Sequence, residues 1–222
     1  IEQGAFCGTS IKEIVIPANV STMATRWTNM GGSTKGYVSA LFGAKELKKV
    51  SFSNGMATIP AGALSKCDQI VTATIPNTVT SIGEYAFFGC SSIQSFALPS
   101  NVVNLGNHAF ANCNNISKII FPSELEILGG YSFENCTNLK NITWNSKLKM
   151  IGEYAFNGCQ NLESVVLPTS IEKIEQGAFS GTSIKEIVIP ASVSKMATRQ
   201  TSMGGYTSGY VSALFGAKEL KK

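Results

Sequence analysis

The sequence predicts a solenoid of stacked coils of about 23 residues, in which each coil adds one short strand to a parallel sheet. Two observations carry this prediction: similar residues recur every 23 positions, and each repeat holds one short apolar segment that usually ends at proline. A third strengthens it, because residues 1–49 return as residues 174–222 with 42 of 49 positions identical. One such unit is too small to bury its apolar face, so neighbouring units must stack into a continuous core.

Three columns of residues keep the 23-residue period in one register. They are a cysteine column (Cys67, Cys90, Cys113, Cys136, Cys159), a mainly aromatic column (Leu64, Phe87, Phe110, Phe133, Phe156, Phe179) and an aliphatic column (Ile59, Ile82, Leu105, Leu128, Ile151, Ile174). Three independent columns in one register leave little room for a chance match. We therefore expect each repeat to form one structural unit.

The short apolar segment has the form L-x-x-I-x-I-P, as in IQSFALP at 93–99 and ISKIIFP at 116–122. Its fourth and sixth residues share one face of a strand, because side chains alternate along a strand. The proline ends the strand, because it cannot donate a hydrogen bond to the ladder. The copies begin at Ile11, Leu47, Ile70, Ile93, Ile116, Leu139, Leu162 and Ile184.

One step between copies is longer than the others. From Ile11 to Leu47 the step is 36 residues, 13 more than the unit of 23, whereas the later steps are 23 or 22. We place the extra residues in an insertion loop within 24–39, which recurs at 197–212. Because no linker interrupts the repeats, we interpret residues 1–222 as a single solenoid of about eight coils and as a fragment of a longer array.

The repeat pattern C-x-x-L-x-x-I-x-L-P, followed by I-G-x-x-A-F, resembles the BspA-like class of leucine-rich repeats. One copy is carried by Cys90, Ile93, Phe96, Leu98, Pro99, Leu105, Gly106, Ala109 and Phe110. The resemblance implies a right-handed leucine-rich repeat solenoid of the α/β, horseshoe-like kind, rich in β-structure, with mostly turns or short helical segments opposite the sheet. It also implies a surface-exposed or secreted protein, since many members are adhesins or surface antigens. Leu64, in place of phenylalanine, and Asn145, in place of proline, depart from the pattern.

Composition and charge disfavour several classes of protein. Charged residues make up 14% of the chain, and of 18 basic residues only Arg26 and Arg199 are arginine. Nucleic-acid recognition usually draws on arginine for bidentate contacts, so we expect no nucleic-acid partner. No apolar run reaches the roughly 18 residues of a membrane span, so no membrane insertion is expected in this segment. The first residues lack a signal-peptide pattern, and any export signal or anchor is expected outside the segment.

Catalytic chemistry has few candidate residues in this chain. Asp68 is the only aspartate and His108 the only histidine, so a two-histidine metal site is excluded. His108 shares a 23-residue column with Tyr85, Tyr131 and Tyr154, which indicates a structural position. We expect neither an enzyme nor a cofactor.

The cysteine column allows a structural, a disulfide or a metal-binding role. No two cysteines have the short spacing of a zinc site. Side chains in register on neighbouring coils point the same way, which disfavours disulfides. Ala44 and Thr182 occupy the same column, as a packing role permits, so we favour buried free thiols. Cys7 lies off the column and becomes Ser180 in the second copy.

Two surfaces are candidates for binding a partner. Four of the seven differences between the copies fall in the sixteen residues 24–39, which fits either a presented surface or a tolerant loop. The outer face of the sheet carries a mildly apolar stripe flanked by lysine, which could bind an extended or acidic partner or be an ordinary solvated sheet. The candidate contact residues are Trp27, Asn29, Tyr37, Tyr206 and Tyr210 in the insertions, and Lys48, Lys118 and Lys140 on the sheet.

From the residues and the resemblance together, we predict a non-enzymatic binding or adhesion module at the cell surface or outside the cell. Its partner would be a host or microbial surface or extracellular-matrix protein, or a glycan, and the module would act as a monomer. The alternative is a rigid structural spacer within a larger surface protein.

Overall fold

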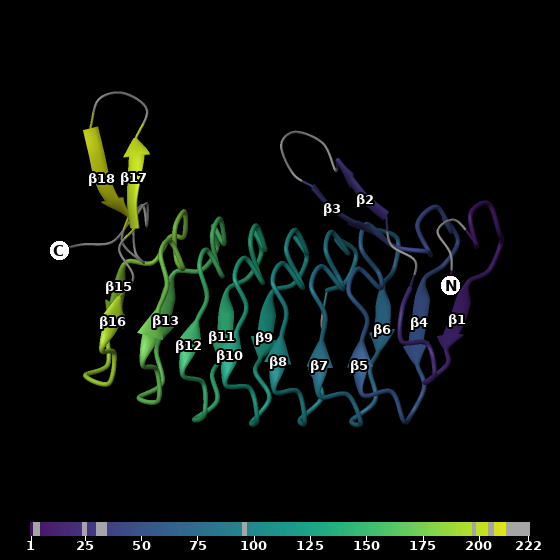
Figure 1. Ribbon diagram of the computed structural model, residues 1–222, viewed down its shortest axis with the longest axis horizontal. Coiled ribbons are helices and arrows are strands. Elements are labelled where there is room, and N and C mark those ends of the chain that lie inside the picture. Colours follow the sequence, from purple (N-terminus) through teal and green to yellow (C-terminus); the bar gives the residue numbers. More distant parts are fainter. Residues whose placement is uncertain are drawn as a thin grey trace.

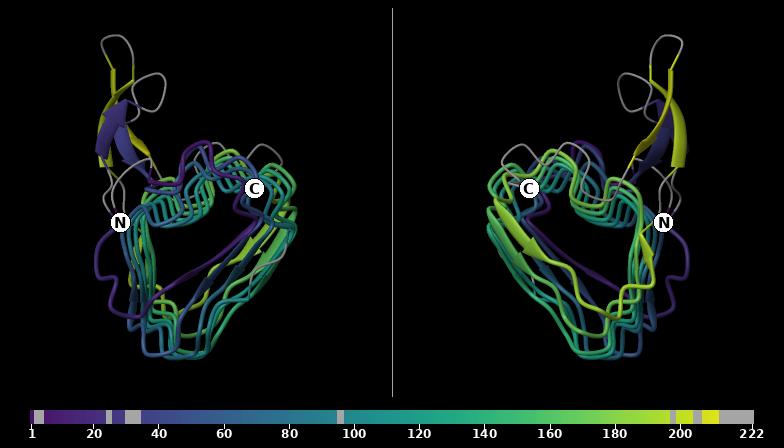
Figure 2. Two further views of the ribbon diagram at one scale, coloured as in Figure 1. Left: turned by 90° about the vertical axis from the view of Figure 1, so that its right-hand side faces the viewer. Right: turned by 90° about the vertical axis from the view of Figure 1, so that its left-hand side faces the viewer.

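The computed structural model describes residues 1, 5–23, 26–29, 35–94, 97–196, 199–203 and 207–211. In these ranges the chain winds into a stack of coils that follow one another in sequence order along the long axis (Figure 1). Seen down that axis, the coils superimpose on a roughly triangular outline (Figure 2). Every regular element in the described ranges is a β-strand, so the helical part of the expected α/β class is not found among these residues. The described ranges also hold no helix long and apolar enough to cross a membrane.

The first side of the solenoid carries the predicted strands. They are β1 (Glu13–Ile16), β4 (Lys49–Phe52), β6 (Thr72–Thr74), β9 (Lys118–Ile120), β11 (Asn141–Thr143), β13 (Ser164–Val166) and β15 (Glu186–Val188). They pair in parallel as β1-β4-β6, β9-β11 and β13-β15. Each strand begins shortly after a predicted start, at the same offset in every coil, so the predicted parallel solenoid is confirmed. In the segment 93–99 no strand is assigned, and residues 95–96 lie outside the described ranges.

A second side of the solenoid carries another sheet, which was not predicted, because only one strand was expected in each coil. Its strands are β5 (Thr58–Ile59), β7 (Ser81–Ile82), β8 (Asn104–Leu105), β10 (Ile127–Leu128), β12 (Met150–Ile151), β14 (Lys173–Ile174) and β16 (Lys195–Met196). They form one parallel seven-stranded ladder in sequence order. Each strand has only two residues, so it is too short to show the alternation that identifies a strand in a sequence. Six of the seven end in the predicted aliphatic column.

The glycine that follows most of these strands is required by the closeness of the coils. A Cβ atom on Gly106 would lie 2.6 Å from the backbone nitrogen of Glu84 in the preceding coil, and one on Gly83 would lie 2.6 Å from that of Ala61. These separations are shorter than a carbon atom tolerates, so a larger residue would push the coils apart. The I-G dipeptide of the repeat is therefore a packing requirement.

The core is built from the predicted columns. Phe87, Phe110, Phe133, Phe156 and Phe179 are fully buried and stack in series, with ring centroids 4.9, 5.4, 5.7 and 5.5 Å apart. Leu64, the departure from this column, is equally buried. Each ring packs on the same ring of the next coil, so the core extends continuously along the stack.

Asn145, the other departure from the repeat pattern, replaces the strand-ending proline and forms side-chain hydrogen bonds. Its side-chain nitrogen donates to the carbonyls of Pro122 and Leu125 in the preceding coil. Its side-chain oxygen accepts from the backbone nitrogens of Lys147 and Leu148, at 2.9 and 2.7 Å. The asparagine thus ends its strand with four side-chain hydrogen bonds, which satisfy backbone groups at the corner.

The third side of the solenoid consists of turns, and a left-handed residue in each turn explains the mixed column around His108. Tyr85, His108, Tyr131 and Tyr154 have φ angles of 55, 54, 56 and 51°, and Gly62 and Gly177 hold the equivalent position. The three contacts from Tyr85 to Tyr154 are stacked, with centroids 4.5, 4.6 and 5.1 Å apart. These four residues adopt a backbone conformation that ordinarily favours glycine, and their side-chain rings stack on one another.

The two insertions fold into antiparallel hairpins. The first pairs β2 (Arg26–Asn29) with β3 (Lys35–Val38), and the second pairs β17 (Arg199–Met203) with β18 (Thr207–Val211). Both project from the same edge of the solenoid, near its two ends, where the second sheet meets the turns (Figures 1 and 2). What was expected to be a loop is therefore a two-stranded extension of the scaffold.

Candidate functional site

The cysteine column is structural, as predicted. The five cysteines of the column are buried, and all six cysteines are free, with Cys7 exposed. The thiols bond to the preceding coil: Cys90 donates to the carbonyl of Leu64 and Cys113 to that of Phe87, each at 3.1 Å. Burial raises the pKa of Cys67 to about 12 and that of Cys113 to about 12, so both stay protonated. Among the described residues no group of three potential ligands could hold a metal ion.

His108 lies between the rings of Tyr85 and Tyr131. Burial lowers its pKa to about 4, and burial also raises the pKa of Glu134. The Nδ1 atom of His108 lies 3.8 Å from a carboxylate oxygen of Glu134, too far for a hydrogen bond. The histidine is therefore a neutral member of an aromatic stack at physiological pH.

The cross-strand register of the first hairpin brings the predicted contact residues together. Trp27 pairs with Tyr37, and Asn29 pairs with Lys35. Because strand residues alternate between two faces, positions 27, 29, 35 and 37 share one face of the hairpin. We call this the variable face. Of Trp27 and Asn29 the structure describes the backbone alone.

The second hairpin repeats this register with different residues. Gln200 pairs with Tyr210 and Ser202 with Ser208, at the positions of Trp27–Tyr37 and Asn29–Lys35. All three differences within the paired strands therefore fall on the variable face. The opposite face reads Arg, Thr, Gly, Val in both copies, at 26, 28, 36 and 38 and at 199, 201, 209 and 211. The fourth insertion difference involves Tyr206, which lies outside the described residues.

The root of the first hairpin is fixed to the turns. The ring of Tyr37 lies 5.8 Å from that of Tyr85 and packs in one apolar cluster with Phe88. The hydroxyl of Ser65 donates to the carbonyl of Tyr37 at 2.5 Å, and the backbone nitrogen of Ser39 donates to the carbonyl of Ser65 at 3.2 Å. Tyr37, predicted to be a partner-contact residue, is therefore half-buried and anchors the hairpin. Its contacts place the root of the variable face against the coils.

The lysines of the predicted sheet surface lie on a different side of the solenoid. Lys48, Lys118 and Lys140 are exposed on or beside the first sheet, and among the described residues none of them forms an ion pair. The apolar stripe is present as well, with Val15, Ile120, Val166 and Val188 exposed by 62, 53, 81 and 69%. The hairpins project from another edge (Figure 2), so the structure does not bring the two predicted surfaces together.

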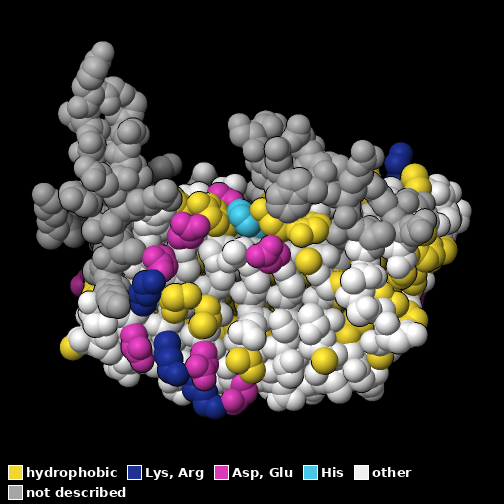
Figure 3. All heavy atoms as spheres, in the orientation of Figure 1, with side chains coloured by type: hydrophobic (Ala, Val, Ile, Leu, Met, Phe, Trp, Pro, Cys, Tyr) yellow, Lys and Arg dark blue, Asp and Glu magenta, His cyan; other side chains and the backbone are white. Residues whose placement is uncertain are grey.

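The charged residues around the second sheet neutralise one another. Lys147 pairs with Glu124 at 2.6 Å and Lys149 with Glu126 at 3.0 Å, each across neighbouring coils. Figure 3 shows basic and acidic side chains interleaved along the lower part of this face. Exposed pairs of this kind stabilise weakly, and on the described part of this face they offer an acidic partner no excess of positive charge.

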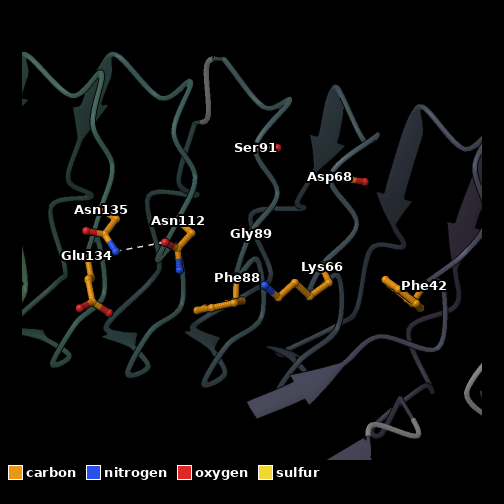
Figure 4. A pocket seen from close by; sticks show the side chains of 9 residues that line it. All are labelled: Phe42, Lys66, Asp68, Phe88, Gly89, Ser91, Asn112, Glu134 and Asn135. Carbon is orange, nitrogen blue, oxygen red and sulfur yellow. Dashed lines mark hydrogen bonds between the residues drawn. The ribbon is translucent and has the colours of Figure 1, made fainter. Parts of the chain in front are cut away.

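A hollow on the turn side was missed by sequence reasoning. It is lined by residues from five successive coils, including Phe42, Lys66 and Asn135 (Figure 4). We call it the furrow. Each coil contributes only one to three of these residues, so no contiguous motif marks the site. The signal available in the sequence was a pair of asparagines at equivalent positions of neighbouring coils, Asn112 and Asn135. The exposure of Phe42 is seen only in the structure.

These features define a leucine-rich repeat solenoid with projecting hairpins. A family model described as BspA type leucine rich repeat region matches the chain in six copies, over residues 34–140 and 80–200. The chain therefore belongs to the BspA type leucine rich repeat family, as the resemblance implied. No curated protein matches it.

Two solved structures share the fold. A leucine-rich repeat protein from Bacteroides ovatus ATCC 8483 is 22% identical, with a TM-score of 0.62 over 82% of this chain and 52% of that protein. The T. pallidum leucine-rich repeat protein is 21% identical, with a TM-score of 0.62 over 78% of this chain and 77% of that protein. The chain thus spans about half of the Bacteroides ovatus protein, and identities this low speak for the fold alone.

Proposed function

We propose that the chain is a non-enzymatic binding module of a cell-surface or secreted protein, and that it recognises a protein or glycan partner through its two hairpins. The observation that carries the proposal is the pattern of differences between the two copies. Positions 27, 29 and 35 differ on the variable face, whereas the opposite face is identical. A hairpin kept only as a tolerant spacer would vary on both faces.

The scaffold supports this role by fixing the hairpins relative to one another. Seven coil steps separate them, which is about 34 Å at the spacing of parallel strands. Both project from the same edge (Figure 1), so a partner with repeated epitopes can engage both. The second contact is then intramolecular and raises avidity without any new chemistry. Location outside the cell is supported by the BspA-like resemblance.

The test is binding to an array of extracellular-matrix proteins and surface glycans. One variant lacks residues 24–36, a deletion that restores the regular step between successive coils. A second is Trp27→Gln, which gives the first hairpin the residue of the second. We expect the deletion to weaken binding at least tenfold and Trp27→Gln to weaken it by about tenfold.

Two controls show whether the variable face itself carries the binding. Thr28→Ser alters the opposite face of the same hairpin, which is identical in both copies, and should leave binding unchanged. Lys48→Glu with Lys140→Glu alters the sheet surface and should also leave it unchanged. Loss of binding in the lysine variant alone would move the site to the sheet. If the wild-type chain binds nothing on the array, the rigid-spacer alternative is favoured.

A further inference from the structure

The furrow is a hollow on the turn side of the solenoid. Its volume is about 520 Å³, and it runs beside the root of the first hairpin. In Figure 4 Phe42, Lys66, Asn112 and Asn135 follow one another along the solenoid, and Asp68 and Ser91 lie to one side of that row. From the coil of Phe42 to that of Asn135 there are four coil steps, about 19 Å at the spacing of parallel strands.

Backbone donors along the furrow are already used within the solenoid. The backbone nitrogen of Lys66 donates to the carbonyl of Phe88, and that of Asn112 to the carbonyl of Glu134, each at 2.7 Å. The backbone nitrogen of Asn135 donates to the next coil in the same way, at 2.7 Å. An extended peptide that binds as an added strand needs free backbone donors, and at Lys66, Asn112 and Asn135 these donors are already used. Side chains are therefore the main groups with which the furrow can recognise a ligand.

Those side chains are mainly small polar groups that both donate and accept. The amide nitrogen of Asn135 donates to the amide oxygen of Asn112 at 3.2 Å. This bond uses one donor of the first amide and one acceptor position of the second, and each amide has further capacity. The hydroxyl of Ser91 also donates and accepts, and the carboxylate of Asp68 adds acceptors. Such groups match a ligand rich in hydroxyls, because each hydroxyl also donates and accepts.

One aromatic ring completes the furrow. Phe42 is 48% exposed at the end of the row, an unusual exposure for a phenylalanine among polar neighbours. The inner ring, Phe88, is buried and covered by the ammonium group of Lys66, 4.9 Å from its centroid. Phe42 therefore supplies the open apolar face, and a sugar ring, with a C–H face and a hydroxyl rim, fits that face beside polar groups.

We propose that the furrow binds a neutral glycan chain. One sugar packs on Phe42, and the hydroxyls of the following sugars bond to Asp68, Ser91, Asn112 and Asn135. The charged groups of the furrow are one ammonium, on Lys66, and two carboxylates, on Asp68 and Glu134, a balance that disfavours a polyanionic glycan. The proposal goes beyond the role of the hairpins, because it rests on residues of the coils.

The experiment is calorimetric titration of the full chain with cellotetraose, chitotetraose and maltotetraose. At least one of these neutral tetrasaccharides is expected to bind. Phe42→Ala should weaken that binding by about tenfold, and Asn112→Ala and Asn135→Ala by about threefold to tenfold each. Val166→Ala, on the exposed first sheet, is the matched control and should leave the affinity unchanged. Trp27→Gln should also leave it unchanged, which separates this site from the hairpins.

Three results would overturn the proposal. The first is that none of the tetrasaccharides binds at millimolar concentration. The second is that binding is the same in wild type, Phe42→Ala and Asn135→Ala. The third is that a heparin-derived tetrasaccharide binds more tightly than the neutral ones, since this would make the furrow an anion site. Thermal unfolding of each variant checks the fold, and the asparagine variants keep the test valid if Phe42→Ala unfolds.

Discussion

The coils and the first hairpin are both built from short β-strands, yet different contacts hold them. Within the seven-stranded ladder an inner coil strand such as β10 pairs with a parallel neighbour on each side, and the adjoining rings stack from Phe87 to Phe179. The strands of the hairpin pair only with each other. Its root is held by the ring of Tyr37 and by hydrogen bonds at Ser39 and Ser65.

This difference explains where the sequence is free to change. A coil position faces the same position in two neighbouring coils, so a substitution disturbs a whole column. A position on the variable face of a hairpin has no equivalent neighbour in the next coil. The two copies accordingly differ at three of 33 positions outside the insertions and at four of 16 within them. The coils are a scaffold, and the hairpins are the part that can diversify.

The largest expected effect comes from removing one ring of the core stack. Phe110 is fully buried between Phe87 and Phe133, so Phe110→Ala should lower the free energy of unfolding by about 3–5 kcal/mol. Urea unfolding measures this change, and hydrogen exchange should rise mainly in the adjoining coils. Phe42→Ala, at a half-exposed position, is the control with a small effect. An even rise of exchange along all coils would contradict the nearest-neighbour picture.

A smaller effect is expected where the coils approach most closely. Gly106→Ala places a Cβ 2.6 Å from the backbone nitrogen of Glu84, so the two coils must separate. We expect a loss of about 1–3 kcal/mol in the free energy of unfolding, measured by urea denaturation. The coil that begins at Leu162 carries Glu175 at the equivalent position, so Glu175→Ala should be close to neutral. A neutral Gly106→Ala would show that the second sheet tolerates wider spacing.

At the boundary between coils and hairpin, stability should depend on pH through His108. Burial holds the pKa of His108 at about 4 in the folded chain, against 6.5 for an unperturbed histidine. Between these values the unfolded chain binds the proton and the folded chain does not, so stability falls as pH falls from about 6.5 to about 4. His108→Tyr, which supplies the residue found at 85, 131 and 154, should flatten this dependence. Urea midpoints across the window measure it.

Glu134 acts in the opposite sense and needs its own control. Burial raises its pKa, so its protonation as pH falls favours the folded chain. Glu134→Gln should therefore steepen the loss of stability on acidification. If His108→Tyr and the wild type lose stability equally across the window, the histidine is not the group responsible.

The smallest effect on stability is expected for replacement of the exposed Cys7. The state of all six cysteines is therefore tested by thiol labelling. A thiol reagent should label one group in the native chain, Cys7, and all six after denaturation without reductant. Cys7→Ser should abolish the native reaction and leave the unfolding midpoint unchanged. Fewer than five reactive thiols in the denatured chain would show that disulfides form within the column.

Much of this architecture could be predicted because the same packing requirement recurs at the same position of many successive coils. The aromatic column, the cysteine column and seven of the eight predicted strands lie where the 23-residue register places them. The second sheet could not be predicted, because two-residue strands such as β8 carry no periodic pattern. The left-handed turn at His108 was visible only as a column that mixes tyrosine and glycine, and only the backbone angles explain it.

The candidate sites were harder to predict because they depend on how coils meet. Trp27 and Asn29 could be selected from the differences between copies, but their cross-strand pairing with Tyr37 and Lys35 required the hairpin register. The side chain of Tyr37 packs against the coils through its contact with Tyr85, which lies in a different coil and far away in the sequence. The furrow joins residues of five coils, so no single segment reveals it.

The most direct test of the central claim is hydrogen exchange in the variant that lacks residues 24–36. This deletion keeps Tyr37 and restores the regular 23-residue step. If the coils are a self-sufficient scaffold, the amides of the seven-stranded ladder, from β5 to β16, will keep the protection that they have in the intact chain. Loss of protection throughout the ladder would contradict the account, because it would make the hairpin part of what holds the coils together.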